Sequence, residues 1–277
     1  MKPVVADYHY RCHCLRIVAT NGTIVRLTDH PRDLLMSGGQ IYKTDSGYQF
    51  TGAQGTTTTS PGVMDLEGVL AIAGIDRDEV ASGVFDGARL YCFATAWNAP
   101  VEDEEPVGAA TLGRTTIVDD RYKIEMMALI DALNQSVGST YTAACPKTFG
   151  GQEFAGCKVD LAPITVTGTV THVTDGTTWR DSARTEAADW FALGTVTWTA
   201  GANAGLKAQE IKRYELDGTV ETYEPAYYGV TVGDTYSLAP GCRKRLEDCR
   251  DKWDNVINFG GYSFVPVSSQ YQQIGTK

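Results

Sequence analysis

Two short stretches decide how this chain is organised: TAACPKTFGGQEFAGCKVDL at residues 142–161 and APGCRKRLEDCRDKW at residues 239–253. Each stretch carries two cysteines among Gly, Pro and charged residues, a composition that is typical of ligand loops. Two local pairs brought together from distant parts of a chain form the pattern of a four-thiolate metal or cluster site. The candidate ligands are Cys145, Cys157, Cys242 and Cys249.

The spacing of these cysteines leaves the metal open. Eleven residues lie within the first pair and six within the second, whereas a zinc knuckle usually holds about two to four. Iron–sulfur clusters accept wider loops, because a cluster is larger than one ion. From the residues alone, a cluster, a zinc ion and unligated buried thiols remain the alternatives. The basic residues that would offset the charge of a cluster are Lys147, Lys158, Arg243, Lys244 and Arg245.

The composition describes an acidic globular protein with a formal net charge of -10 over 277 residues. Such a charge argues against a protein that coats nucleic acid, which would need a basic face. No apolar run approaches the roughly 18 residues of a membrane span, and the first residues lack the apolar region of a signal peptide. We therefore expect folding in a reducing cytosol, where the cysteines are free or metal-bound.

Strand patterns dominate both halves of the chain. Residues 8–29 predict a hairpin that turns at Asn21-Gly22, a strong hairpin signal. Thr and Val alternate over residues 164–238 with frequent glycine turns, which predicts five or six strands in a small barrel or curled sheet. Further strands are expected at residues 87–97, 107–118 and 121–128, and short helices near 75–83 and 129–133.

These patterns predict a mainly β chain with two or more small β-barrel or curled-sheet domains and few short helices, linked by a four-cysteine cluster site. The expected domains are an N-terminal β-rich domain at 1–140, a first cysteine loop at 141–163, an inserted β-barrel at 164–239, and the second cysteine pair with the C-terminal tail at 240–277.

The remaining candidates for function have simpler interpretations. Cys12, Cys14 and Cys92 lie in strand patterns and are expected to be buried core residues. The acidic run at 102–105 precedes a proline and is expected to be a solvated turn. An adhesin surface is the alternative to a core position for four aromatic residues of the β block: Trp179, Trp190, Tyr227 and Tyr228.

An enzyme is the less favoured class. The sequence contains no GxSxG, HExxH or phosphate-binding glycine loop. A cysteine hydrolase would need a thiolate beside a histidine and an orienting group, and the four histidines carry no such local signature. A cell-wall hydrolase with a cysteine nucleophile is kept as an alternative.

Five motifs in one order resemble the tail-tip, or baseplate, hub proteins of long-tailed bacteriophages and gene transfer agents. The motifs are TDHPRDL, GVFDGARLYCFATAW, ALNQSVGSTYTAACPKTFGGQEFAGCKVDL, FALGTVTWTAGANAG and GCRKRLEDCRDKWDNVINFGGYSFVP. The resemblance covers nearly the whole chain and includes the lambda tail-tip protein, which binds a [4Fe–4S] cluster through four C-terminal cysteines.

The resemblance implies a structural virion protein at the tail tip, assembled in the cytoplasm of the host bacterium, and no enzymatic activity. It implies a homotrimeric ring with a distal tail protein above, a central tip or fibre protein below, and DNA passing through without sequence-specific binding. It also implies a [4Fe–4S] cluster held by Cys145, Cys157, Cys242 and Cys249, with zinc as the alternative. The long gap between the two pairs departs from the lambda arrangement, because a whole domain is inserted there.

Overall fold

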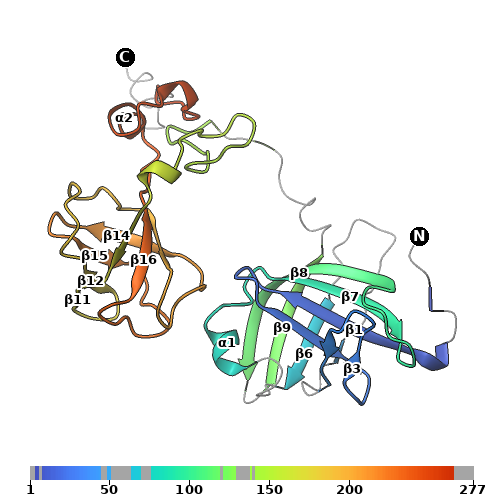
Figure 1. The fold of residues 1–277 in the computed structure, drawn as a ribbon. Helices are drawn as coiled ribbons and strands as arrows, with labels where there is room; N and C mark the ends of the chain where they lie inside the picture. The colour runs from blue at the N-terminus through green and yellow to red at the C-terminus, as the bar shows by residue number, and fades with distance from the viewer. Residues whose placement is uncertain are drawn as a thin grey trace. The chain divides into compact units, whose positions relative to one another are not determined.

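The computed structural model of this protein describes residues 4–5, 8–44, 49–50, 64–69, 76–118, 121–128, 138 and 141–264. The chain forms two compact units, Met1–Ser136 and Val137–Lys277, and each contains a seven-stranded antiparallel sheet (Figure 1). The described helices are short, and none could cross a membrane. The predicted fold class is confirmed as far as a mainly β chain with two curled sheets and few short helices. The helix expected near 129–133 lies outside the described residues.

The sheet of the first unit has the strand order β2-β1-β7-β8-β9-β6-β5. Its strands are β1 (Arg11–Val18), β2 (Ile24–Thr28), β5 (Gln49–Phe50), β6 (Met64–Val69), β7 (Arg89–Ala96), β8 (Glu105–Val118) and β9 (Arg121–Ala128). The unit also contains a hairpin of β3 (Leu34–Leu35) and β4 (Ile41–Tyr42), helix α1 (Arg77–Ala81) and a 3-10 helix at Tyr8–Tyr10. The hairpin predicted around Asn21-Gly22 is the antiparallel pair β1 and β2.

Alternating burial on the strands builds the core of the first unit. Leu15 and Ile17 on β1 and Leu90 on β7 are buried together, as a two-residue side-chain period requires. The register shifts between Cys92 and Phe93, and such bulges bend a strand and increase its twist. Cys12, Cys14 and Cys92 are buried in this unit, which confirms that they are core residues.

The run of four acidic residues at 102–105 turns the chain from β7 into β8, as expected, but its side chains are half-buried and not solvated. Glu102 accepts hydrogen bonds from Tyr42 Oη at 2.6 Å and from Arg16 at 3.1 Å. Glu105 pairs with Arg11 at 3.0 Å. The expected turn is present, and only its solvation was wrong, because β1 contributes arginines that bind Glu102 and Glu105. A local charge pattern does not reveal such partners.

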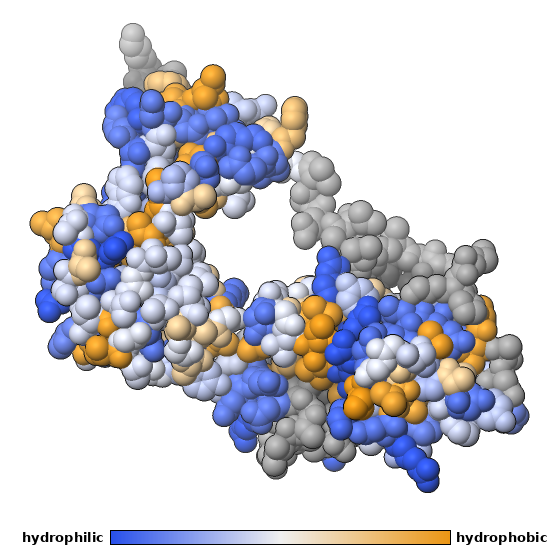
Figure 2. All heavy atoms as spheres, viewed as in Figure 1, coloured by the Kyte–Doolittle hydropathy of each residue, from blue (hydrophilic) through white to orange (hydrophobic). Residues whose placement is uncertain are grey.

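The sheet of the second unit has the order β10-β16-β13-β14-β15-β12-β11. Its strands are β10 (Val166–Thr169), β11 (His172–Val173), β12 (Thr178–Arg180), β13 (Thr195–Trp198), β14 (Gln209–Tyr214), β15 (Thr219–Thr222) and β16 (Thr235–Ala239). Val196 and Trp198 of β13 are buried, and Thr195 and Thr197, which alternate with them, are exposed. The alternation therefore separates surface from core. Much of this sheet's surface is pale in Figure 2, as threonine and glycine should make it.

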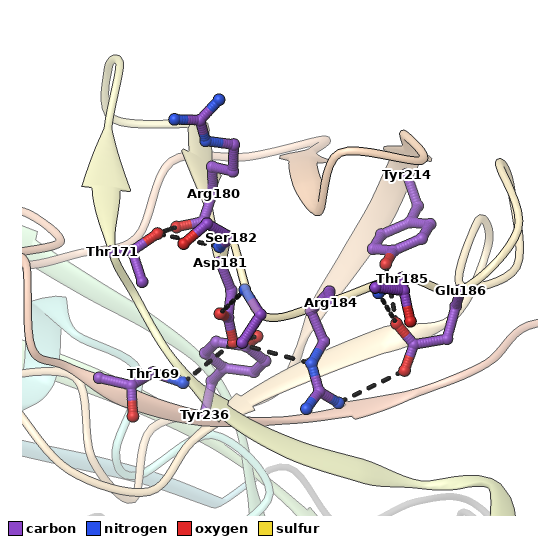
Figure 3. Close-up of polar contacts among 11 residues, drawn as sticks. Thr169, Thr171, Arg180, Asp181, Ser182, Arg184, Thr185, Glu186, Tyr214 and Tyr236 are labelled. Carbon is purple, nitrogen blue, oxygen red and sulfur yellow. Dashed lines mark hydrogen bonds and ion pairs between the residues drawn. The ribbon is translucent and has the colours of Figure 1, made fainter.

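A cluster of polar residues around Asp181 links strands of this sheet through hydrogen bonds (Figure 3). The carboxyl group of Asp181 is buried, and it accepts a hydrogen bond of 2.5 Å from Tyr236 Oη on β16. It also accepts backbone N–H groups of Thr169 at 3.2 Å and Ala183 at 2.9 Å, and Arg184 lies 3.8 Å away. Because its neighbours satisfy the carboxyl group, the cluster joins β10, β16 and the loop after β12.

We predict that Tyr236→Phe lowers the free energy of unfolding of the second unit by about 1–3 kcal/mol, because a buried carboxyl group loses a donor. Burial and the bond to Asp181 raise the pKa of Tyr236. The stabilisation is therefore present below the ordinary tyrosine range near pH ~10 and is lost as the pH rises above it. Urea unfolding at several pH values measures both effects. Tyr223→Phe is the control, since Tyr223 is exposed, and equal stability of the two variants would contradict the prediction.

Candidate metal centre

The second sheet brings the two cysteine stretches together by pairing β10 and β16, which are its first and last strands along the chain. β10 and β16 are antiparallel neighbours, and Val166 near the start of β10 pairs with Leu238 near the end of β16. The first stretch ends shortly before β10, and the second begins where β16 ends. The 84 residues between Cys157 and Cys242 therefore return the chain to the end of the sheet from which it started.

The four predicted ligands line one cavity. Cys145, Cys157, Cys242 and Cys249 line a small cavity of about 20 Å³ that is partly open to solvent, and a cavity of this size holds about one water molecule. Cys249 is buried and the other three are half-buried. Among the described residues, no group of three or more His, Cys, Asp or Glu side chains is arranged to hold a single metal ion. The structure thus gathers the four side chains, and their role as ligands stays a prediction.

Cys249 lies on a helix, although a loop was expected for both members of its pair. Helix α2 spans Leu246–Asp251, and Glu247 and Asp248 in its first turn favour the positive end of the helix dipole. Cys249 is the buried residue of α2. The expectation was wrong because the Gly and Pro that suggested a loop lie before the helix, beside Cys242. The other three cysteines lie outside helices and strands.

Backbone hydrogen bonds fasten the two stretches to each other. The N–H of Cys145 donates to the carbonyl of Lys244 at 2.9 Å. The side-chain amide of Asn255 donates to the carbonyl of Cys157 at 2.6 Å, and the N–H of Asn255 bonds to the carbonyl of Cys249 at 2.8 Å. Asn255 therefore connects one cysteine from each pair.

Lys147 makes a second connection at the same place. Its ammonium group donates to the carbonyl of Asn258 at 2.6 Å and to the carbonyl of Gly156 at 3.3 Å. Lys244 Nζ donates to the carbonyl of Lys147. Hydrogen bonds from charged groups are roughly twice as strong as neutral ones, so this lysine pair is a main link between the stretches.

N–H groups point at three of the four sulfur atoms. Such contacts stabilise thiolates in metal sites and tune the potential of iron–sulfur clusters. Cys145 accepts from the N–H of Gly260 at 3.4 Å, Cys242 from the N–H of Lys244 at 3.4 Å, and Cys157 from the side-chain amide of Asn255 at 3.7 Å.

Burial shifts the acidity of the centre's thiols. It raises the pKa of Cys242, an effect that the N–H and the charge of Lys244 partly oppose. Burial also raises the pKa of Cys249, and the three other thiols raise it further. A raised pKa keeps a free thiol protonated and a poor nucleophile. Metal binding would displace these protons.

A close backbone approach positions Cys242. A Cβ atom added at Gly241 would lie 2.0 Å from the carbonyl carbon of Leu193, so only glycine fits there. Gly241 packs in this way against the loop before β13. This contact fixes the position of the neighbouring Cys242 relative to the sheet.

The other predicted residues divide between the centre and elsewhere. Lys147, Lys244 and Arg245 line the cavity, as a charge-offsetting role requires. Lys158 donates instead to the carbonyl of Gln152, and Arg243 lies 3.6 Å from Asp189.

Of the aromatic residues considered for an adhesin, Trp179 is buried, Trp190 and Tyr228 are partly buried, and Tyr227 is exposed.

Sequence reasoning did not single out Asn255, Asn258 or Trp253, which also line the cavity. The two asparagines belong to the last of the five motifs, but they act through hydrogen bonds to residues about a hundred positions away, and the motif does not reveal these partners. For Trp253, the signal was its spacing of four residues from Cys249, about one helical turn; in the structure Trp253 lies in the turn that follows α2.

Comparisons with known proteins place the chain among tail proteins. The family model described as "Baseplate hub protein, N-terminal attachment domain" matches residues 6–160. A second model, "Phage conserved hypothetical protein BR0599", matches residues 189–269. A search of curated proteins gave no match. A solved structure described as "Virion of native gene transfer agent (GTA) particle" contains a chain with a TM-score of 0.82 and 24% identity, over 96% of this chain and 91% of that one. That likeness shows the fold.

We predict that Lys147→Met loosens the cysteine segments and lowers their local stability by about 1.5–3 kcal/mol, because hydrogen bonds from a charged group are lost. Hydrogen exchange of residues 141–163 and 240–264 measures the change. Lys158→Met is the matched control, since Lys158 is exposed and its bond is local. Unchanged protection in the Lys147 variant would contradict the assigned role.

Proposed function

Because this chain belongs to the family of baseplate hub proteins, we propose that it builds the hub of a phage or gene-transfer-agent tail and that its four cysteines hold an iron–sulfur cluster. The family makes it a structural protein of the virion, located in the tail. The observation that supports the metal is the cavity that Cys145, Cys157, Cys242 and Cys249 line together. Two segments far apart in sequence meet at this one point.

The surroundings of the cavity fit a cluster better than a zinc ion. Four thiolates at about 2.3 Å from a zinc ion would close around it and leave no space between them. Among the described residues, the side chains are not arranged around a single ion, although the four cysteines line the same small cavity. The N–H groups aimed at three sulfurs and the nearby lysines suit a group with sulfide ligands and negative charge.

The chain's own residues divide the work of holding the group. The four cysteines would be its ligands, Gly260, Lys244 and Asn255 would donate to their sulfurs, and Lys147 would hold the segments in register. When bound, an iron–sulfur cluster supplies four iron–thiolate bonds, and these cross-link the two stretches. All four cysteines belong to the second unit, so the centre ties the barrel to the segments that flank it.

The assembly that we propose is a homotrimeric ring between a distal tail protein and a central tip or fibre protein. The family description, an attachment domain of a baseplate hub, supports a role in joining tail parts. The net charge of -10 suits a ring through which DNA passes, because like charges limit sticking.

We predict that native mass spectrometry of the purified protein shows three copies. A monomer at micromolar concentration would count against self-assembly.

Neither alternative function is favoured by the described residues. A cysteine nucleophile needs a lowered pKa, whereas burial raises the pKa of Cys242 and of Cys249. An adhesin that uses Trp179 would need it at the surface, and it is buried in the barrel core.

We predict that protein purified without oxygen contains iron and sulfide and absorbs broadly near ~400 nm, as thiolate–iron charge transfer does. Replacing any one of the four cysteines by serine should remove most of the iron, because each supplies a bond. Cys92→Ala is the control, because Cys92 is buried in the first unit. If the purified protein is colourless and contains one zinc per chain, the bound group is zinc and not a cluster. If it contains no metal, both assignments are rejected.

A further inference from the structure

Cys249 lacks the hydrogen bond that the other three cysteines of the cavity have. Its thiol donates to the carbonyl of Asn255 at 3.1 Å. Among the residues that the structure describes, no N–H group lies within hydrogen-bond distance of Cys249 Sγ, whereas each of the other three sulfurs accepts one. A metal-bound thiolate has lost its proton and only accepts. Cys249 would therefore need a donor once it is a ligand.

Trp253 carries a donor that has no acceptor. Its Nε1 is buried and has no hydrogen-bond partner among the described residues, and its side chain lines the cysteine cavity. A buried indole N–H usually has a partner, and leaving it without one costs about 1–3 kcal/mol. A group bound in the cavity would offer such an acceptor.

The backbone places Trp253 on the side of Cys249. The N–H groups of Lys252 and Trp253 both donate to the carbonyl of Asp248, at 3.0 and 3.2 Å. The chain therefore keeps turning beyond the end of α2 as far as Trp253, in a turn that widens from four to five residues. Side chains four residues apart on such a turn lie on the same face. Trp253 follows Cys249 by four residues.

Neighbouring groups hold the indole ring in place. Phe149 packs against it with ring centroids 4.7 Å apart, and Trp190 packs at 5.5 Å. The ammonium group of Lys252 lies 4.7 Å from the centroid of Trp253 and 4.9 Å from that of Trp190. It also donates to the carbonyl of Trp190 at 2.7 Å. A ring fixed on several sides cannot turn to find another acceptor.

We propose that Trp253 Nε1 is the fourth hydrogen-bond donor of the metal centre and acts at its Cys249 corner, on the thiolate or on an adjoining sulfide. The inference rests on the proposed function, because it needs a bound group. Trp253 is then a positioning residue that retains the cluster. It also raises the reduction potential of the cluster, since an N–H dipole stabilises the more negative, reduced form.

Full-length Trp253→Phe, purified without oxygen beside the wild type, tests this proposal. We expect the variant to release iron to a chelator about tenfold faster, the lower end of the usual effect of losing an outer hydrogen bond to a metal site. We also expect a more negative reduction potential in a spectroscopic titration. Trp97→Phe is the control, because it removes an indole N–H from the first unit, whose described residues do not line the cavity. It should behave as the wild type does.

The outcomes separate this proposal from the function on which it rests. A wild type that holds no metal overturns both. A metal-loaded wild type with an equal release rate and potential in Trp253→Phe overturns the donor role alone. If the wild type holds zinc, the donor role of Trp253 is tested by the rate at which the variant releases zinc to the chelator: faster release supports the role, and an equal rate overturns it. Should the phenylalanine variant fail to fold, a benzothiophene analogue of tryptophan at position 253 keeps the ring's shape and removes only the N–H, and it should show the same faster release.

Discussion

The antiparallel pairing of β10 with β16 is the contact on which the second unit and its cysteine centre depend. Four residue pairs, from Val166 with Leu238 to Thr169 with Thr235, join the first and last strands of this sheet. The pairing closes a loop of 84 residues between the two cysteine pairs, and it sets down both ends of that loop side by side. The buried Asp181–Tyr236 hydrogen bond reinforces the same pair of strands. This pairing is what brings the four thiols into the same region of the fold.

The segments that carry the centre are too small to stabilise themselves by burial. The described parts, residues 141–164 and 240–264, contain one α-helix and two 3-10 helices, Ala162–Ile164 and Val256–Asn258. Segments of this size rarely bury enough apolar surface and usually need cross-links or a metal. Here the links are polar: Lys147 and Asn255 bind backbone carbonyls across the two stretches. A metal group at the cysteines would act in the same way, with much stronger bonds.

The seven cysteines show how surroundings separate chemical roles. Cys92 packs into the apolar core of the first unit, and burial raises its pKa to about 12. Such a thiol is inert and serves as a small apolar side chain. Cys145 and Cys242 have comparable chemistry, but each accepts an N–H group and lies beside a lysine that lines the same cavity. For Cys145, Cys157 and Cys242, N–H donors at the sulfur distinguish a candidate ligand from a packing residue, whereas Cys249 is distinguished by its place in the cavity lining.

The sequence by itself determined the strand-rich class, the hairpin at Asn21-Gly22, the identity of the four candidate ligands and the family. These features depend on side-chain periodicity, turn chemistry and motifs that are local along the chain. Only the tertiary structure decided that the four thiols share a cavity, that Cys249 lies on a helix and that Lys147, Asn255 and Trp253 complete the lining. Only it showed that the acidic run of the first unit binds arginines. The reason is physical: strand pairing and charged contacts join residues tens of positions apart, and nothing in a local pattern specifies which partner the fold will bring.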